Sequence, residues 1–236
     1  MNRLFSALLA LFLLSAPFFA SARSGPIKVW ASFQKIYVPG GYDSNDRVEI
    51  VGEGRFKNSC FRLAETKVQI DAQNKKIYLS PVAYEYSGDC LQVTVGFEKN
   101  IDVGILGAGT WEVIQGSGPT KLGAISIRET VGKNADDYLY APVSQAFYHQ
   151  QGAISKIVVS GDFPSDCFKL EQVKMTVEPS VLVLQPVVQF ESRVDCKEGK
   201  FPFVREIVVN AVPAGRYLLH VRSLNGNSVN SLVDIN

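Results

Sequence analysis

The chain has 236 residues, of which 46% are apolar, and its 24 basic residues nearly balance its 23 acidic ones. A formal net charge of +1 gives no electrostatic basis for binding nucleic acid or an anionic membrane surface, so neither partner is expected. The composition is that of a globular protein, and the length suits two domains of about 100 residues each.

Residues 1–22 have the pattern of a secretory signal peptide. Arg3 precedes an apolar stretch, Leu8–Phe19, and Ala20-Ser21-Ala22 matches a small-residue cleavage site. The apolar stretch is shorter than the roughly 20 residues that a membrane span needs. We therefore expect cleavage after Ala22, no membrane insertion of the mature chain, and a periplasmic or secreted location.

Two blocks of residues occur twice in register. Gly54-Arg55-Phe56 stands six residues ahead of Cys60, as Gly161-Asp162-Phe163 stands six ahead of Cys167. A second block has the same spacing after Cys90 as after Cys196; its members are Phe97, Ile101, Val103, Leu106, Ala108, Gly109 and Trp111 in the first copy and Phe203, Ile207, Val209, Val212, Ala214, Gly215 and Tyr217 in the second. Such self-similarity indicates two copies of one unit. We expect domains at 23–131 and 132–236, joined by the polar segment 128–137.

The four cysteines occupy equivalent places in the two copies. Cys60 and Cys90 are 30 positions apart, and Cys167 and Cys196 are 29 apart. Equivalent places should be paired equivalently, so one structural disulfide is predicted in each copy. The close C-x-x-C spacing of redox or metal sites is absent from the sequence.

Apolar residues alternate with polar ones in most of the chain, which is the pattern of β-strands. The clearest segments are 48–51, 68–70, 77–79, 101–103 and 111–113, and then 157–159, 175–177, 181–184, 207–209 and 217–221. Short strands at even spacing predict an all-β fold of two tandem antiparallel β-sandwiches. Within 217–221, His220 opposes Leu219 and Val221, so an exposed strand position is expected for it.

The repeated glycine-aromatic segments resemble those of immunoglobulin-like and fibronectin-like bacterial domains. These segments are Ala108-Gly109-Thr110-Trp111-Glu112-Val113 and Ala214-Gly215-Arg216-Tyr217-Leu218-Leu219-His220-Val221. The resemblance implies that the glycine turns the chain into a late strand and that the aromatic ring packs at the edge of an immunoglobulin-like sandwich. The antibody-type disulfide spans a longer separation and is not carried over. No catalytic residue follows from the likeness.

The two copies also differ where they begin. The first begins Tyr37-Val38-Pro39 and the second Tyr140-Ala141-Pro142, which we interpret as equivalent positions. The second copy then carries Phe147, Tyr148 and His149, a possible contact segment.

Tyr78, Tyr84 and Tyr86 share parity and form a second candidate contact set. On an inner sheet face these rings are core, whereas on an outer face they can stack against a sugar or a partner protein. Core or cross-strand packing is the favoured interpretation.

Other chemistry is weakly indicated. Asp43, Asn45 and Asp46 offer oxygen atoms but lack the remaining positions of a calcium-binding loop, so a turn is favoured. No G-x-S-x-G motif is present, and neither catalytic residues, cofactor nor metal ligands are predicted. We expect a non-catalytic binding or structural module of the cell envelope, with a protein or glycan partner. The alternatives are a periplasmic chaperone-like protein and an envelope hydrolase with an unrecognised site.

Overall fold

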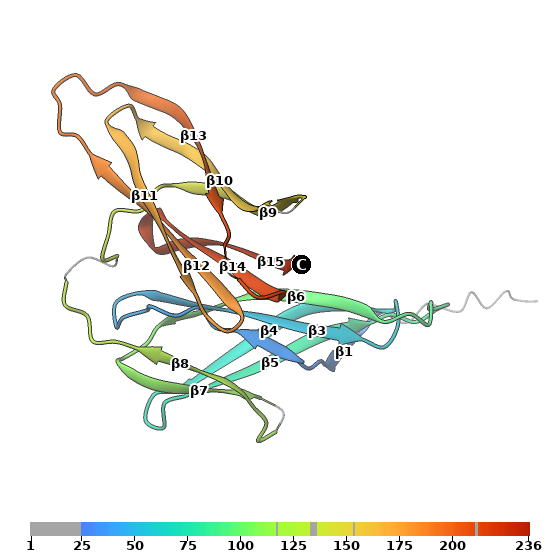
Figure 1. Cartoon of the computed structure of the whole chain (residues 1–236). Coiled ribbons are helices and arrows are strands. Elements are labelled where there is room, and N and C mark those ends of the chain that lie inside the picture. Colours follow the sequence, from blue (N-terminus) through green and yellow to red (C-terminus); the bar gives the residue numbers. More distant parts are fainter. Residues whose placement is uncertain (1–24, 117, 133–135, 153, 211) are drawn as a thin grey trace, which may run out of the picture.

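The structure is a computed structural model that describes residues 25–116, 118–132, 136–152, 154–210 and 212–236; the predicted signal peptide lies outside them. The described residues form strands, with one short 3-10 helix at Leu224–Gly226. We call 25–132 the first half and 136–236 the second half. Figure 1 shows the second half stacked above the first.

The first half contains two sheets. The larger sheet comprises β1 (Ile27–Trp30), β4 (Phe61–Asp71), β5 (Lys76–Glu85), β7 (Gly109–Gln115) and β8 (Lys121–Ile127), in the order β1-β5-β7-β8 with β4 paired to β5. The smaller sheet comprises β2 (Lys35–Tyr37), β3 (Arg47–Phe56) and β6 (Val95–Ile105), in the order β2-β3-β6. Both sheets contribute alternate residues, such as Ile50 and Ile77, to one apolar core.

The second half repeats this plan. One sheet has the order β11-β12-β14-β15, from β11 (Phe168–Val177), β12 (Val181–Phe190), β14 (Gly215–Ser223) and β15 (Asn227–Ile235). The other has the order β13-β10-β9, from β9 (Val143–Gln151), β10 (Ile154–Ser165) and β13 (Glu198–Val208). A separate apolar core, including Ile157 and Leu219, again draws on both sheets.

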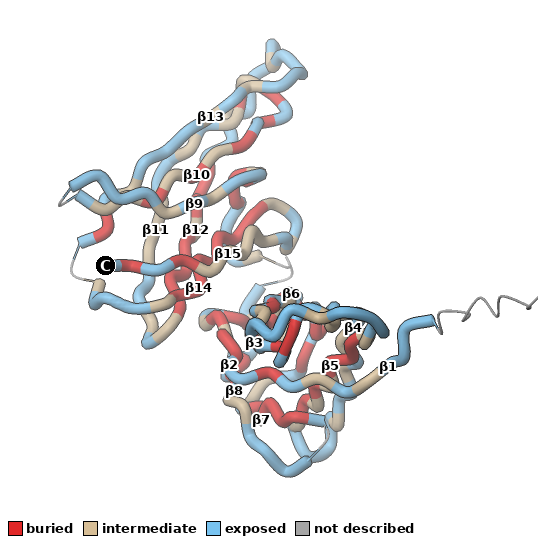
Figure 2. Tube along the Cα trace, turned by 90° about the vertical axis from the view of Figure 1, so that its right-hand side faces the viewer, coloured by how far each residue is buried: buried red, intermediate tan, exposed pale blue. Residues whose placement is uncertain are grey.

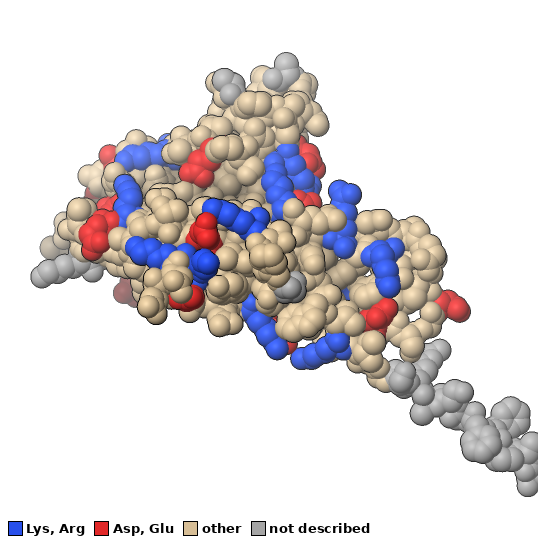
Figure 3. Space-filling model, turned by 90° about the horizontal axis from the view of Figure 1, so that it is seen from below, with Lys and Arg blue, Asp and Glu red and all other residues tan. Residues whose placement is uncertain are grey.

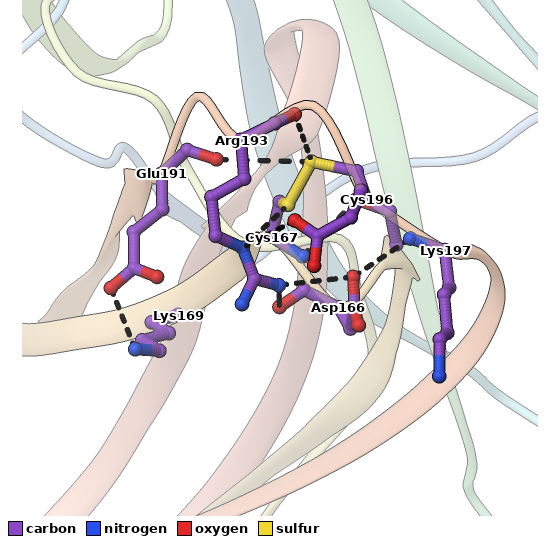
Figure 4. Close-up of polar contacts among 9 residues, drawn as sticks. Asp166, Cys167, Lys169, Glu191, Arg193, Cys196 and Lys197 are labelled. Atoms are coloured by element: carbon purple, nitrogen blue, oxygen red, sulfur yellow. Dashed lines mark hydrogen bonds and ion pairs between the residues drawn. A yellow bond between two sulfur atoms is a disulfide. The ribbon is translucent and has the colours of Figure 1, made fainter.

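Both predicted disulfides are present. Cys60 pairs with Cys90 and Cys167 with Cys196, with Cα–Cα distances of 5.4 and 5.6 Å. Figure 4 shows the second bridge, over which the Arg193 guanidinium reaches the Asp166 carboxylate at 3.3 Å.

The repeated glycine has a packing reason in each copy. Gly54 and Gly161 lie on β3 and β10, where an added Cβ would collide with the backbone carbonyl oxygen of Ser32 and of Pro142 respectively. Only a residue without a side chain allows this close approach of two backbone segments.

The aromatic residues that follow the second repeated glycine are also equivalent in position. Trp111 on β7 and Tyr217 on β14 are both buried, each in the core of its own half. This agrees with their matched spacing in the sequence.

The prediction of purely antiparallel sheets is wrong at two ladders. Strands β5 and β7 pair in parallel, as do β12 and β14, whereas the other nine ladders among the described residues are antiparallel. The reason is topological: between the two parallel strands the chain crosses into the opposite sheet through β6 or β13, and two reversals restore its direction.

The proposed equivalence of Tyr37 with Tyr140 is also wrong. Tyr140 forms an antiparallel bridge with Val187, and Trp30 pairs with Val82 in the same way. The residue after each makes the same hydrogen bond, because the amides of Ala31 and Ala141 donate to Pro81 and Pro186. Trp30 is therefore the counterpart of Tyr140, and the shared Tyr-x-Pro sequence does not mark structurally equivalent positions.

The two halves pack against each other through sheet faces. The outer face of β2 and β3 presents Tyr37 and Val51, and the outer face of β12, β14 and β15 covers them. The apolar residues that cover them are Val181, Val183, Leu218 and Leu232. Figure 2 shows this contact between the β2-β3-β6 region and β14 and β15. The strand ladders themselves stay within each half.

Candidate functional site

An exposed aromatic cluster lies on the outer face of the larger first-half sheet. Trp30 on β1 is 62% exposed, and Tyr86, which directly follows β5, is 41% exposed. The Tyr84 ring lies 6.5 Å from the Tyr86 ring in a T-shaped arrangement. We call Trp30, Tyr84 and Tyr86 the aromatic face. An exposed group of large rings is a typical mark of a binding surface.

Strand parity explains why these rings point outward. Ile77, Leu79 and Ala83 of β5 are buried in the core. The even-numbered residues of β5, which include Tyr84, therefore lie on the outer face of the sheet. Strand β1 then pairs with the end of β5, which sets Trp30 opposite Val82 and Lys28 opposite Tyr84.

Three cationic side chains accompany the rings. Lys67 Nζ lies 5.5 Å from the Trp30 ring centroid, and Lys28 Nζ lies 5.8 Å from that of Tyr84. The Arg62 guanidinium lies 6.0 Å from the centroid of Tyr86. Lys28 also contacts the Glu65 carboxylate at 3.2 Å, whereas Lys67 and Arg62 form no ion pair within the described part of the chain.

Figure 3 looks at the molecule from below, the side on which the first half lies in Figure 1. Lys and Arg side chains are spread over this view rather than gathered in one block.

The second half does not repeat this group of three rings, although Tyr138 is 42% exposed there with Lys174 Nζ 3.9 Å from its centroid. Tyr140, the counterpart of Trp30, is buried, and its hydroxyl accepts a hydrogen bond from Gln185 Nε2 at 2.8 Å. Glu191 stands where the first half has Tyr86, since the amides of Tyr86 and Glu191 donate to the carbonyls of Cys60 and Cys167. Lys169 pairs with Glu191 at 2.6 Å, which Figure 4 shows.

Of the predicted contact residues, Tyr84 and Tyr86 lie together, and Tyr78 lies on the same outer face but farther along β5. None of the three belongs to the buried core, so that part of the interpretation is wrong, whereas Tyr84 and Tyr86 do pack against each other on the sheet surface. The sequence did not indicate that Trp30 joins this group, because β1 is short and pairs only with a strand distant in the chain.

The other predicted contact segment lies on β9, an edge strand of the second half. Phe147 and His149 point outward, while the Tyr148 ring packs toward the second core, with its hydroxyl 2.8 Å from Ser155 Oγ. These residues are therefore remote from the aromatic face.

The contact between the halves contains a buried polar cluster that sequence reasoning missed. The Arg222 guanidinium lies 3.3 Å from the Asp46 carboxylate and donates to the Gly41 carbonyl at 2.8 Å. Both charged side chains are buried. Burial raises the pKa of Asp46, although the amide of Asp43 and the guanidinium of Arg222 oppose that effect.

The expectation that His220 is exposed is wrong. The first half covers this face of β14, and His220 is buried with its Nδ1 2.7 Å from Asn230 Oδ1. Desolvation lowers the pKa of His220 to about 4, and the charge of Arg222 acts in the same direction. The hydrogen bond to Asn230 opposes the shift only in part.

The cavity beside this cluster has a volume of about 20 Å³, which is room for about one water molecule. It is too small for an organic substrate. The turn predicted at 43–46 is present, and its carboxylates accept hydrogen bonds from its own backbone amides. The described residues contain no cluster of three or more metal-ligating side chains.

Wider clefts open at one end of each half. The first-half cleft has a volume of about 420 Å³ and is lined by Phe56 and Phe61 among others; the second-half cleft, of about 670 Å³, is lined by Phe163 and Phe168. The same phenylalanine pair lines both clefts, as the repeat predicts, but Trp30 of the aromatic face lines only the first-half cleft.

Comparisons with known protein families, curated proteins and solved structures found no match to this chain. No helix among the described residues is both long and apolar enough to cross a membrane.

Proposed function

We propose that this protein is an exported, non-catalytic glycan-binding protein of the cell envelope, and that the aromatic face is its binding site. The observation that carries the proposal is the wide exposure of Trp30 on the same sheet face as the paired rings of Tyr84 and Tyr86. Sugar rings present C–H surfaces that stack on aromatic faces, and Trp and Tyr supply such faces with little loss of conformational entropy.

The ligand class is an acidic polysaccharide. Lys67 and Arg62 lie beside the rings and form no ion pair with an acidic side chain of the described residues, so a carboxylate or phosphate on the sugar could pair with them. Cations on long side chains can move from a ring to an anion at small cost because both positions are solvated. Two disulfides accord with export to an oxidising compartment.

The proposal includes the finer architecture: each half is an immunoglobulin-like β-sandwich. Two sheets sharing one core in each half support it, and the parallel ladders are a departure from the immunoglobulin arrangement. The site itself depends only on the larger first-half sheet.

The test is affinity electrophoresis and calorimetry of residues 23–236, made in an oxidising compartment, against acidic and neutral polysaccharides. Trp30→Ala and Tyr86→Ala should each weaken binding to the acidic polymer by about tenfold or more, which corresponds to about 1.4 kcal/mol. The matched control is Tyr138→Ala, since Tyr138 is an exposed second-half ring whose centroid lies 3.9 Å from Lys174 Nζ.

Binding should also weaken as salt is added, because charge pairing at an exposed surface is screened. Binding of neutral polymers alone, with no salt dependence, would remove the acidic ligand from the proposal. Retention of none of the polymers, or equal loss on Tyr138→Ala, would overturn the site.

A further inference from the structure

The contact between the halves shows how one sheet face of this fold is covered. In the first half, Tyr37 of β2 pairs with Val51 of β3, and both side chains are buried beneath the second half. The covering surface belongs to the four-stranded sheet of the second half. The two copies therefore contact each other through non-equivalent faces, the three-stranded sheet of the first half and the four-stranded sheet of the second.

The second half carries the counterpart of the covered face. Strand β9 pairs with β10 as β2 pairs with β3, and the register sets Phe147 opposite Val158 where the first half has Tyr37 opposite Val51. This face is open: Phe147 is 48% exposed. Figure 2 shows β13, the other edge of this sheet, exposed along much of its length on the side away from the first half.

Several apolar residues extend this open face across the sheet. Val204 and Val208 of β13 are 69% and 49% exposed, and both share outward parity with Glu206. Lys156 of β10 pairs with Glu206 at 2.6 Å in the same outward layer. We call Phe147, Val158, Val204 and Val208, with Lys156 and Glu206, the open face.

The opposite end of the chain is built differently. The parallel ladder between β5 and β7 is equivalent to the one between β12 and β14. Its pair Lys76–Glu112 occupies the place of the docking pair Val181–Leu218. Glu112 also forms an ion pair with Lys121 at 2.7 Å. Tyr78 and Ala124 stand in place of Val183 and Leu232, so this first-half surface is mixed, with charged residues at two of its four positions, whereas the open face of the second half is mainly apolar.

We propose that the open face binds the open face of a second copy of this chain, forming a two-fold symmetric dimer. The face carries one cation and one anion, so a two-fold axis can set Lys156 of each copy near Glu206 of the other without placing like charges together. The alternative head-to-tail contact would press Phe147 and Val158 against a surface where the charged Lys76 and Glu112 replace Val181 and Leu218. A two-fold contact pairs the open face of one copy with the same face of the other, so the assembly closes at two chains.

The test is sedimentation equilibrium of residues 23–236 over a wide concentration range. The wild-type protein should be a dimer, and Val204→Asp should weaken self-association by about 100-fold or more, since Val204 lies opposite the uncharged Ser160 and the change buries a charge on both sides of the axis. The matched control is Val177→Asp on β11, because Val177 is 46% exposed on a strand outside the open face.

Thermal melts of each variant establish that the loss of association is not a loss of folding. Phe147→Asp provides a second variant on a different strand of the same face. A monomer at every concentration would overturn the proposal, as would a dimer that survives both open-face variants or one that Val177→Asp dissociates equally. Open-ended growth beyond two chains would overturn the two-fold arrangement and indicate a head-to-tail contact instead.

Discussion

His220 should make the stability of this protein fall as the pH is lowered from about 6.5 to about 4. The unfolded chain takes up a proton on this imidazole near its ordinary pKa of 6.5, whereas burial between the halves lowers the folded pKa to about 4. Across that window the unfolded state binds more protons, so the free energy of unfolding decreases as the pH falls and levels off below it. The difference between 6.5 and about 4 corresponds to about 3 kcal/mol.

The hydrogen bonds around His220 identify which tautomer of the neutral imidazole is present in the folded protein. Asn230 Nδ2 donates to Glu49 Oε2 at 2.8 Å, which turns its Oδ1 toward the ring. His220 Nδ1 therefore carries the proton and donates to that oxygen at 2.7 Å. A second proton on Nε2 would place a cation in a buried site that Arg222 already makes positive.

The assay is urea denaturation of the wild type and of His220→Gln at pH values from about 7.5 down to about 4. The variant should lack the part of the pH dependence that His220 supplies, so the difference in unfolding free energy between the two proteins should change through the window. His149→Gln is the control, since His149 lies exposed on β9 and should leave the wild-type profile unchanged. Parallel profiles of wild type and His220→Gln would refute the reasoning.

Two further changes test the packing that the repeat imposes. Gly161→Ala should destabilise the protein by several kcal/mol or prevent folding in thermal melts, because the added Cβ would collide with the Pro142 carbonyl oxygen. The control Gly96→Ala on β6, with open space around it, should change stability by about 1 kcal/mol or less. Equal effects of the two substitutions would contradict the close-approach argument. Arg222→Met should lower the free energy of unfolding, measured by urea denaturation, by about 3–5 kcal/mol, because it leaves the Asp46 carboxylate buried without its partner. Adding Asp46→Asn should recover part of that stability, whereas additive effects of the two substitutions would show that the pair is not coupled.

The features of this fold that depend on local pattern or on the repeat were predictable. Alternation places most of the long strands, and equivalence between the copies chooses the cysteine pairs among three possibilities. Strand β15 was missed because its first residues, Asn227 to Asn230, are mostly polar and show no clear alternation. The parallel ladders were missed because strand patterning carries no information about direction.

The sites were harder to predict because they depend on which faces meet. Parity on β14 correctly sets His220 opposite the core of its own half, but parity cannot distinguish a face in water from a face covered by another domain. Trp30 was missed as a site residue for a related reason: its neighbours on the aromatic face come from strands more than 30 residues away. A periodic pattern reports the direction of a side chain and not what lies in that direction.

The two proposals are linked by the way in which the copies differ. In the second half, the outer face of the four-stranded sheet is apolar where it docks on the first half. The same sheet in the first half has the charged residues Lys76 and Glu112 at two of those positions and carries the aromatic face near the other end of β5. Dimerisation through the open faces of the second halves would leave both aromatic faces free, because each belongs to a first half. A chain that binds one glycan segment weakly would then hold a polymer at two points, and the second contact would form at the high effective concentration that the dimer sets.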